Sequence, residues 1–316
     1  MSPSLYRSFI TIAICTCDRD TQIGDTLDTL RQNAYPDFRV LVVDQSRNAS
    51  TYAIIREFQR VWSRLDYIHS DVVGLSAARN LAITASSSPI LAFTDDDCLV
   101  SPNWVAQIAD AFIADAELGV LFGRVLPDQG LNADQLPVAV QPSRQEQTLV
   151  GLPNLLRINL FTFGSGNSMA LRRSKIPIVG RFDEGFGAGS PLNGGEDIDY
   201  LYRALAAGLK VTYNPLVLSY HKMWRSAAQV DTLYLRTHVS AGALLAKHLI
   251  LGTPRARLYA LSRFWYFIVR PAIHGLVRAS PWRIRRSVAA AIGTTQGIRR
   301  YRQTHLLPSA LEEWRP

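Results

Sequence analysis

The chain has 316 residues, which is enough for one large α/β domain and a smaller appendage. Hydrophobic residues make up 47% of the sequence and charged residues 19%, a balance that excludes an intrinsically disordered chain. The formal net charge of +8 suits anionic partners such as phosphates, nucleic acid or anionic lipid, and it does not choose among them.

The cysteine count and the hydropathy bear on location. Three cysteines without a framework spacing predict free thiols and a reducing compartment, so we expect a cytoplasmic protein. The segment that begins at Met1 has no apolar stretch long enough for a signal peptide. No run of about 18 uncharged apolar residues occurs, so no transmembrane helix is expected.

The first third of the chain alternates between strand and helix patterns. Apolar, β-branched runs predict strands at 9–15, 38–43, 65–69 and from residue 90 onward. Amphipathic spacing predicts helices at 23–33, 50–62 and 74–85. This alternation indicates βαβ units and a parallel sheet with right-handed crossovers.

The middle of the chain is less regular. A helix is expected from 102 to about 115, followed by a strand at 120–125. The Gln- and Pro-rich segment 127–153 is interpreted as a loop or flap. Further expected elements are a strand at 165–171, a glycine-rich mobile loop at 181–195, a helix at 196–207 that ends at Gly208, and strands at 209–213 and 217–221, with Asn214-Pro215 as the nearest thing to a linker.

From about Trp224 the pattern changes to helices that mix aromatic residues with arginines, expected at 230–251, 255–277 and 281–302. Two interpretations stay open. The helices could form a platform on a membrane surface, or an appendage that packs on the preceding domain or on a second subunit. We expect one domain at 1–223, in two halves at about 1–125 and 126–223, and a helical region at 224–316.

Three consecutive carboxylates, Asp95, Asp96 and Asp97, follow the apolar run that begins at residue 90. They fall at the carboxyl end of a predicted buried strand, where open α/β sheets bind ligands. Adjacent like charges repel one another, so a fold tolerates them best when a cation neutralises them, and hard divalent cations prefer such oxygen ligands. The alternative is a solvated acidic turn.

Other polar residues fall at strand and helix ends. Asp44 ends the second strand and could accept a hydrogen bond from a base or ribose, or simply form a turn. Arg79 could reach a phosphate or lie on the surface. Glu196 and Asp197 begin a helix after two glycines, where one could act as a general base while both also favour the helix dipole. His221 follows Asp197 by 24 residues and is a candidate metal ligand or an ordinary buried histidine.

Taken in order, six short motifs between residues 8 and 221 resemble family 2 glycosyltransferases with the GT-A fold. They are residues 12–19, 42–46, 74–80 and 93–97, Gly166-Asn167, and Gly195-Glu196-Asp197. Two positions depart from the family pattern: Gln45 stands where a second acid is more usual, and Asp18 stands where the first loop usually has Asn. The resemblance implies an α/β fold with a Rossmann-like mixed, mostly parallel sheet flanked by helices, and a C-terminal helical extension. It also implies that 1–223 is the catalytic domain, with a nucleotide-binding half at about 1–125 and an acceptor half at about 126–223.

The resemblance also implies a role for each matching position. Thr16 and Asp44 would contact the base, Arg79 would lie near the base or the phosphates, and Asp95 and Asp96 would hold the ribose side of the nucleotide.

On the chemical side, Asp97 and His221 would bind the metal, and Asp197 would be the catalytic base. The expected contacts of the donor sugar and the acceptor are Gly166, Asn167, Gly195, Glu196 and Trp224.

By this resemblance we expect an inverting enzyme that uses Mn²⁺ or Mg²⁺ and serves cell-surface glycan, polysaccharide or glycolipid synthesis. The donor would be a nucleotide sugar, UDP-linked by default, with GDP or dTDP as other choices. The acceptor would be a glycan or a lipid-linked sugar, and no nucleic-acid partner is expected. The protein would be cytoplasmic or peripheral on the inner face of the cell membrane, and a homo-oligomer stays open.

Two alternatives explain less of the sequence. A sugar nucleotidyltransferase needs a Gly-rich phosphate loop and a Lys after the first strand, and residues 16–21 have neither. A non-catalytic basic module would explain the charge but not the carboxylate cluster, because phosphates avoid acidic sites.

Overall fold

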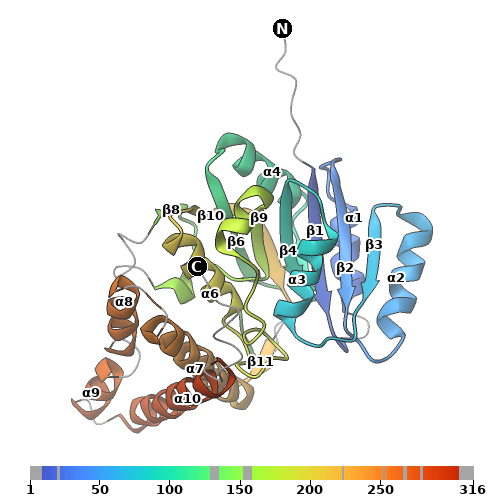
Figure 1. Cartoon of the computed structure of the whole chain (residues 1–316). Helices are drawn as coiled ribbons and strands as arrows, with labels where there is room; N and C mark the ends of the chain where they lie inside the picture. Colours follow the sequence, from blue (N-terminus) through green and yellow to red (C-terminus); the bar gives the residue numbers. More distant parts are fainter. Residues whose placement is uncertain are drawn as a thin grey trace.

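The computed structural model describes residues 9–19, 22–128, 135–151, 159–222, 224–250, 252, 254–265, 269–277 and 280–305. A central nine-stranded sheet has the order β3-β2-β1-β4-β9-β6-β10-β5, and β8 pairs with β10 beside this path (Figure 1). Its strands are β1 (Ile10–Thr16), β2 (Phe38–Asp44), β3 (Leu65–His69), β4 (Ile90–Asp95), β5 (Cys98–Val100), β6 (Leu118–Pro127), β8 (Gln147–Val150), β9 (Ser168–Arg172) and β10 (Lys210–His221).

Helices cover both faces of the parallel part of the sheet, as Figure 1 shows. They are α1 (Ile23–Arg31), α2 (Ser50–Val61), α3 (Leu75–Ala85), α4 (Trp104–Ala114) and α6 (Glu196–Ala206). Alternate residues of β1 enter two separate cores: Ile12 and Ile14 pack with α1 and α4, whereas Ala13 packs with α3 and α6. A strand that is buried on both faces reads as a continuous apolar run, which is why the sequence shows no alternation here.

The predicted strands and helices up to residue 115 are confirmed, with ends shifted by two residues at most. Beyond them the sheet becomes mixed, because β9 lies antiparallel between β4 and β6 and β5 lies antiparallel to β10. The α/β fold class and the mixed sheet are confirmed. Short helical segments complete this part at residues 160–162 and 173–175 and in α5 (Ile176–Val179).

Two expectations about the middle of the chain are wrong. Segment 127–153 is not only a loop, since it contributes β8 to the main sheet and β7 (Gln135–Pro137), which pairs with β11 (Trp224–Ser226). Asn214-Pro215 is not a linker, since β10 runs through it as one strand. The register with β6 shifts between Asn214 and Leu218, so Pro215 falls where the ladder is interrupted and its missing N–H costs no ladder hydrogen bond.

The C-terminal part contains α7 (Ala227–Ile250), α8 (Pro254–Phe264), α9 (Arg270–Val277) and α10 (Pro281–His305). Of the helix expected at 255–277, residues 254–265 and 269–277 are helical and include α8 and α9, and residues 266–268 lie outside the described residues. Close packing of α7 on α10 depends on glycine: a Cβ added at Gly297 would overlap the carbonyl oxygen of Val239, and one at Gly242 would overlap that of Thr294. Among the residues that the structure describes, we find no helix both apolar and long enough to cross a membrane.

Helix α7 is anchored to the part of the chain that carries the central sheet by charge and by ring packing. Lys247 Nζ lies 2.7 Å from Asp183 Oδ2 and 2.8 Å from Asp199 Oδ1, and Asp199 is fully buried. The next residue, His248, packs its ring on that of Tyr202 of α6 at 3.8 Å between centroids. The helical region thus packs directly behind the helix that carries Glu196 and Asp197.

Candidate active site

The parallel register brings three of the candidate residues to one edge of the sheet. Thr16 at the end of β1 lies beside Asp44 at the end of β2. On the other side of β1, Cys15 lies beside Asp95 at the end of β4. Residues that are 28 or more positions apart in sequence therefore meet at the carboxyl edge, where such sheets bind ligands.

The acidic triplet is not a solvated turn. Asp96 and Asp97 are only 3% and 2% exposed, whereas Asp95 is partly open. The Thr16 hydroxyl donates to Asp96 Oδ2 at 2.6 Å, and Arg19 donates to Asp96 Oδ1 at 3.3 Å and to Asp97 Oδ2 at 2.5 Å. Burial raises the pKa of Asp96 to about 6 although Arg19 and Thr16 oppose it. The protein thus holds two buried carboxylates with a single guanidinium.

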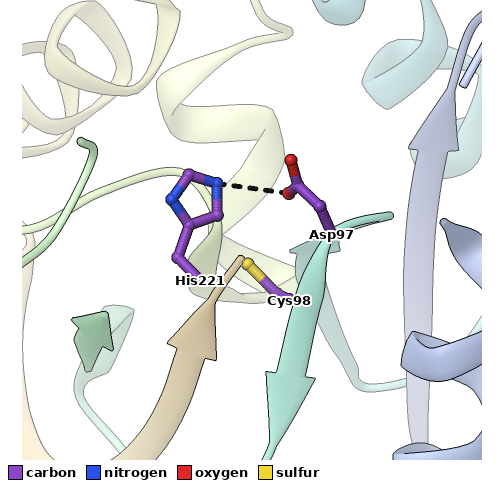
Figure 2. A group of neighbouring side chains, drawn as sticks. All are labelled: Asp97, Cys98 and His221. Carbon is purple, nitrogen blue, oxygen red and sulfur yellow. Dashed lines mark ion pairs between the residues drawn. The ribbon is translucent and has the colours of Figure 1, made fainter. Parts of the chain in front are cut away.

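Asp97 faces His221, which ends β10 (Figure 2). His221 Nε2 lies 3.2 Å from Asp97 Oδ1, and antiparallel pairing places His221 beside Cys98. His221 Nδ1 lies 2.8 Å from the Val138 carbonyl, which can only accept, so Nδ1 carries a hydrogen and the ring is fixed. Burial alone would lower the pKa of His221, but Asp97 outweighs it and raises that pKa above its ordinary value.

These groups fit a divalent cation. Asp97 Oδ1 is buried and faces His221 Nε2, the ring nitrogen that is not bound to the Val138 carbonyl. An oxygen and a nitrogen donor in this arrangement suit Mn²⁺, Mg²⁺ or a similar ion. The Cys98 sulfur lies in the same cluster, but burial raises the pKa of its thiol well above the ordinary value, so it stays protonated and is a poor ligand.

Glu196 and Asp197 follow two glycines in left-handed or extended positive-φ conformations, with φ of 133° at Gly194 and 82° at Gly195. This turn starts α6 and separates the two carboxylates. Glu196 is buried and accepts from Arg79 at 3.0 Å. Asp197 is half-buried, and its Oδ2 accepts from the Gly166 N–H at 2.8 Å.

Arg79 is not a surface residue. Its side chain is 2% exposed and lies over the rings of Phe93 and Phe182 at 5.5 and 5.4 Å. One terminal nitrogen donates to Glu196 and the other donates to the Gly166 carbonyl at 3.0 Å. Arg79 therefore binds the carbonyl of Gly166, and the N–H of the same residue binds Asp197. Through Glu196 and Gly166 it positions both carboxylates.

The carboxyl group of Glu196 has a raised pKa. Burial and the neighbouring Asp197 raise the pKa of Glu196 to about 7, with Arg79 opposing the shift. Glu196 is buried against Arg79, whereas Asp197 is partly open to the cavity.

Asp44 and Gln45 stabilise the loop after β2. Asp44 is buried and accepts from the Tyr67 hydroxyl at 3.0 Å and from the Ser46 N–H at 2.9 Å. Gln45 donates to the Gly74 carbonyl at 3.1 Å and accepts from the Gly74 N–H at 3.2 Å. A carboxylate could not donate to that carbonyl, which is a physical reason for an amide at position 45.

The other departure from the family pattern has a backbone explanation. Asp18 has φ of 51°, a left-handed conformation that Asp and Asn tolerate better than most residues. Its Oδ1 accepts from the Arg47 N–H at 2.9 Å, and its own N–H donates to the Ser46 hydroxyl at 2.8 Å. The residue joins the loops that follow β1 and β2.

Two cavities adjoin at Asp95, which lines both. The first, of about 480 Å³, is lined by Thr16, Arg19, Gln45, Asp96 and Arg225, among others. The second, of about 350 Å³, is lined by Gly166, Asn167, Gly195, Glu196 and Asp197 and, from α7, by Leu233, Thr237 and Ser240. The structure thus places Asp95, Asp96, Glu196 and Asp197 around two neighbouring cavities.

The predicted residues Asp44, Asp97 and His221 line neither cavity. Asn167 is buried and donates to the Ala139 carbonyl at 3.2 Å, while its Oδ1 has no hydrogen bond from the described residues. The backbone of Trp224 belongs to β11, and its side chain lies outside the described residues.

Sequence reasoning missed Arg19 and the side chains of α7. Arg19 is the last residue of the motif at 12–19, and its place in that motif was the available sequence signal for a role in the site. The α7 residues carry no such signal, because their place in the cavity wall depends on how a helix more than 30 residues beyond Asp197 packs back onto the sheet.

The glycosyl transferase family 2 model matches residues 11–176. Glycosyltransferase AglE of Haloferax volcanii is 26% identical over 220 residues, which cover 67% of this chain and 66% of that protein. Succinoglycan biosynthesis protein ExoM of Rhizobium meliloti is 29% identical over 212 residues, 65% of this chain and 64% of that protein. The validoxylamine A glucosyltransferase of Streptomyces hygroscopicus subsp. limoneus is 28% identical over 228 residues, 64% of this chain and 49% of that protein. The chain thus spans about half to two thirds of these relatives.

Solved structures share the fold. The mannosyltransferase PcManGT from Pyrobaculum calidifontis, in complex with GDP-Man and Mn²⁺, superposes with a TM-score of 0.63 at 18% identity. The superposition covers 99% of this chain and 82% of the PcManGT chain. S. aureus TarS 1-349, in complex with UDP-GlcNAc, gives a TM-score of 0.54 at 16% identity, with 93% and 89% covered. With the family match over more than half of its length, the chain belongs to glycosyl transferase family 2 and has the GT-A fold.

Proposed function

We propose that this protein is a glycosyltransferase that moves a sugar from a nucleoside diphosphate to an acceptor hydroxyl with inversion, assisted by a divalent cation. One observation carries the proposal. The half-buried carboxylate of Asp197, held by the Gly166 N–H, lines a cavity that adjoins a second cavity at Asp95. The cavity lined by Thr16 and Asp96 suits the nucleotide, and the cavity lined by Asp197 suits the sugar and the acceptor.

The donor would occupy the cavity lined by Thr16, Gln45 and Asp96, with Asp95 and Asp96 toward the ribose and Asp44 supporting the base-binding loop. The neighbouring structures were solved with GDP-Man and UDP-GlcNAc, which supports a nucleotide sugar as the class of donor. UDP is our default base, with GDP or dTDP as alternatives.

The cation, Mn²⁺ or Mg²⁺, would be held by Asp97 Oδ1 and His221 Nε2. When bound, it stabilises the negative charge of the departing diphosphate as a Lewis acid. The Val138 carbonyl keeps the His221 ring in one orientation, and the burial of both side chains excludes water from the ligand atoms.

Asp197 would be the base. The Gly166 N–H orients Oδ2, and the Ile198 N–H donates to Oδ1 at 2.8 Å. As the acceptor oxygen bonds to the anomeric carbon, the bond from that carbon to the diphosphate oxygen breaks and the hydroxyl proton passes to Asp197. A single displacement with one base inverts the anomeric configuration, and general-base help contributes about 10²–10⁴ in rate.

The wider setting of the reaction is part of the same proposal. The acceptor is a glycan or a lipid-linked sugar in cell-surface glycan, polysaccharide or glycolipid synthesis, and the protein works in the cytoplasm. The ExoM name supports a polysaccharide pathway. A catalytic domain of 1–223 and a helical region of 224–316 remain our division, with α7 adding Leu233, Thr237 and Ser240 to the acceptor wall.

A panel of UDP-, GDP- and dTDP-sugars with Mn²⁺ tests the proposal by thermal shift and by slow hydrolysis to the diphosphate. A donor at 100 times its Kd should stabilise the fold by about 2.7 kcal/mol. A product with retained anomeric configuration, read by NMR, would overturn the single displacement. Pyrophosphate release from a nucleoside triphosphate and a sugar phosphate would instead indicate a nucleotidyltransferase.

A further inference from the structure

The net excess of positive charge in this protein lies in one part of the chain. Between Asp231 and Glu312 the sequence has 13 Lys and Arg residues and no Asp or Glu. The rest of the chain, with 21 basic and 26 acidic residues, has a net charge of −5. The catalytic part is therefore mildly acidic, and the whole basic excess belongs to the helical region.

Helix α8 in this region turns its apolar residues outward. Leu258 and Leu261 are each 55% exposed, and Phe264 one turn later is also exposed. These residues share a face by their helical spacing, whereas Tyr259 on the opposite side is buried. A helix in water normally has the reverse arrangement.

Helices α9 and α10 repeat the pattern. On α9, Ile273 and Val277 are exposed one turn apart. On α10, exposed Val288 and Ile292 lie on the side opposite Gly297, which contacts α7. Figure 1 shows α8, α9 and the first half of α10 together on the side of α7 away from the central sheet.

Arginines border these apolar residues. Arg257, Arg283 and Arg285 are exposed. Trp282 is 61% exposed and is stacked by Arg286, whose guanidinium lies 4.8 Å from the Trp282 ring and 4.3 Å from the Tyr234 ring of α7. An interfacial helix has this composition, with aromatic and aliphatic side chains beside basic ones.

We propose that α8, α9 and the first half of α10 form a docking surface for an anionic lipid bilayer. Nucleic acid would neutralise the arginines but would leave the apolar residues in water. A bilayer offers both partners at once, since its phosphates meet the arginines and its acyl boundary receives the leucine, phenylalanine and tryptophan side chains.

Docking would bring the membrane to the acceptor side of the site. Tyr234, which stacks on Arg286, lies on α7 between Leu233 and Thr237, and both of those line the cavity that holds Asp197. A membrane beside this cavity implies a lipid-linked acceptor. Only this consequence rests on the proposed function. The docking itself is measured without donor or acceptor, so each idea can fail separately.

Co-sedimentation of the full chain with phosphatidylcholine vesicles, with and without phosphatidylglycerol, tests the surface. We expect binding to the anionic vesicles only, weakened by salt. The triple variant Arg257→Gln, Arg283→Gln, Arg285→Gln should lower the partition coefficient about 100-fold, at roughly fivefold for each arginine near the surface. Leu258→Gln with Leu261→Gln should weaken the binding that persists at high salt.

Matched controls lie on α2, far from the helical region. Arg56→Gln with Arg60→Gln, and Val61→Gln at a position 74% exposed, should leave vesicle binding unchanged. All of these positions are on the surface, so the variants should melt at the wild-type temperature. Absence of binding to anionic vesicles, tighter binding to nucleic acid, or a stable dimer in which the α8 leucines are protected would each overturn the proposal.

Discussion

The guanidinium of Arg19 is bound to Asp97, with Nη2 2.5 Å from Oδ2, on the carboxylate oxygen that does not face His221. A second nitrogen reaches Asp96 at 3.3 Å. Arg19 is one third exposed, so its side chain has room to move. It therefore neutralises the buried acids without covering the oxygen and nitrogen that suit a cation.

The first prediction concerns this arginine. Arg19→Gln should tighten the binding of Mn²⁺ in the absence of donor by about tenfold, because it removes a positive charge a few ångströms from the entering ion. Titration calorimetry, or the loss of the free Mn²⁺ signal in electron paramagnetic resonance, would measure it. Arg31→Gln, at an exposed pair with Asp28, is the control and should change nothing. Weaker binding in Arg19→Gln would mean that the guanidinium holds the carboxylates in place for the ion.

The second prediction assigns the base. Asp197→Asn keeps an oxygen for the Gly166 N–H but cannot take a proton, so transfer should fall at least 10²-fold while the donor Kd stays nearly unchanged. Glu196→Gln keeps an acceptor for Arg79 and should retain transfer within about tenfold. Initial rates and donor titrations on both variants are needed. The reverse pattern would move the base to Glu196, whose pKa of about 7 makes it the competing candidate.

The third prediction concerns acid stability. Burial, with smaller effects of nearby charges, lowers the pKa of His248 to about 4, against an ordinary value near 6.5. Between pH 6.5 and 4 the unfolded chain protonates this histidine while the folded protein keeps it neutral. The free energy of unfolding therefore falls by roughly 3 kcal/mol as the pH falls from 6.5 to 4.

Urea unfolding of wild type and His248→Leu at neutral and acid pH would measure this loss. The variant should be less stable at neutral pH, because it loses the ring contact with Tyr202, but its stability should fall less on acidification. His69→Gln, at an exposed histidine, is the control and should follow the wild-type slope. Parallel pH slopes for wild type and His248→Leu would show that His248 is not the titrating group.

The fourth prediction tests the contact between α7 and α10. A Cβ at Gly297 would overlap the Val239 carbonyl and lie 2.8 Å from the Ala243 nitrogen, and neither backbone atom can rotate away. Gly297→Ala should therefore destabilise the protein by about 1–3 kcal/mol. At Gly24 of α1 a Cβ would lie 4.0 Å from Ile54, so Gly24→Ala should be neutral or stabilising by up to about 1 kcal/mol. Equal urea midpoints for the two variants would contradict this packing.

Local pattern predicted the first third of the chain well and the middle poorly. The early strands are buried on both faces and separated by amphipathic helices, so period and composition identify them. Strands β7 and β8 have three and four residues, and their existence depends on β11 and β10, which lie at least 60 residues away. No window of neighbouring residues contains that information.

By itself the sequence determined the alternation of strand and helix, the residues at the carboxyl ends of the strands, and the chemistry of the Asp95-Asp96-Asp97 and Glu196-Asp197 motifs. These are properties of short segments, in which side-chain period and composition decide which residues are buried.

Only the tertiary structure decided which groups face one another. His221 meets Asp97 because β10 pairs with β5 in one antiparallel register, and a shift of one residue would turn the ring to the other face. Arg79 turns to Glu196 and Gly166 because its pocket offers acceptors deep inside the protein. Helix α7 lines the cavity because Lys247 and His248 pack it onto α6. Contacts between distant segments follow from register and packing, which no local pattern encodes.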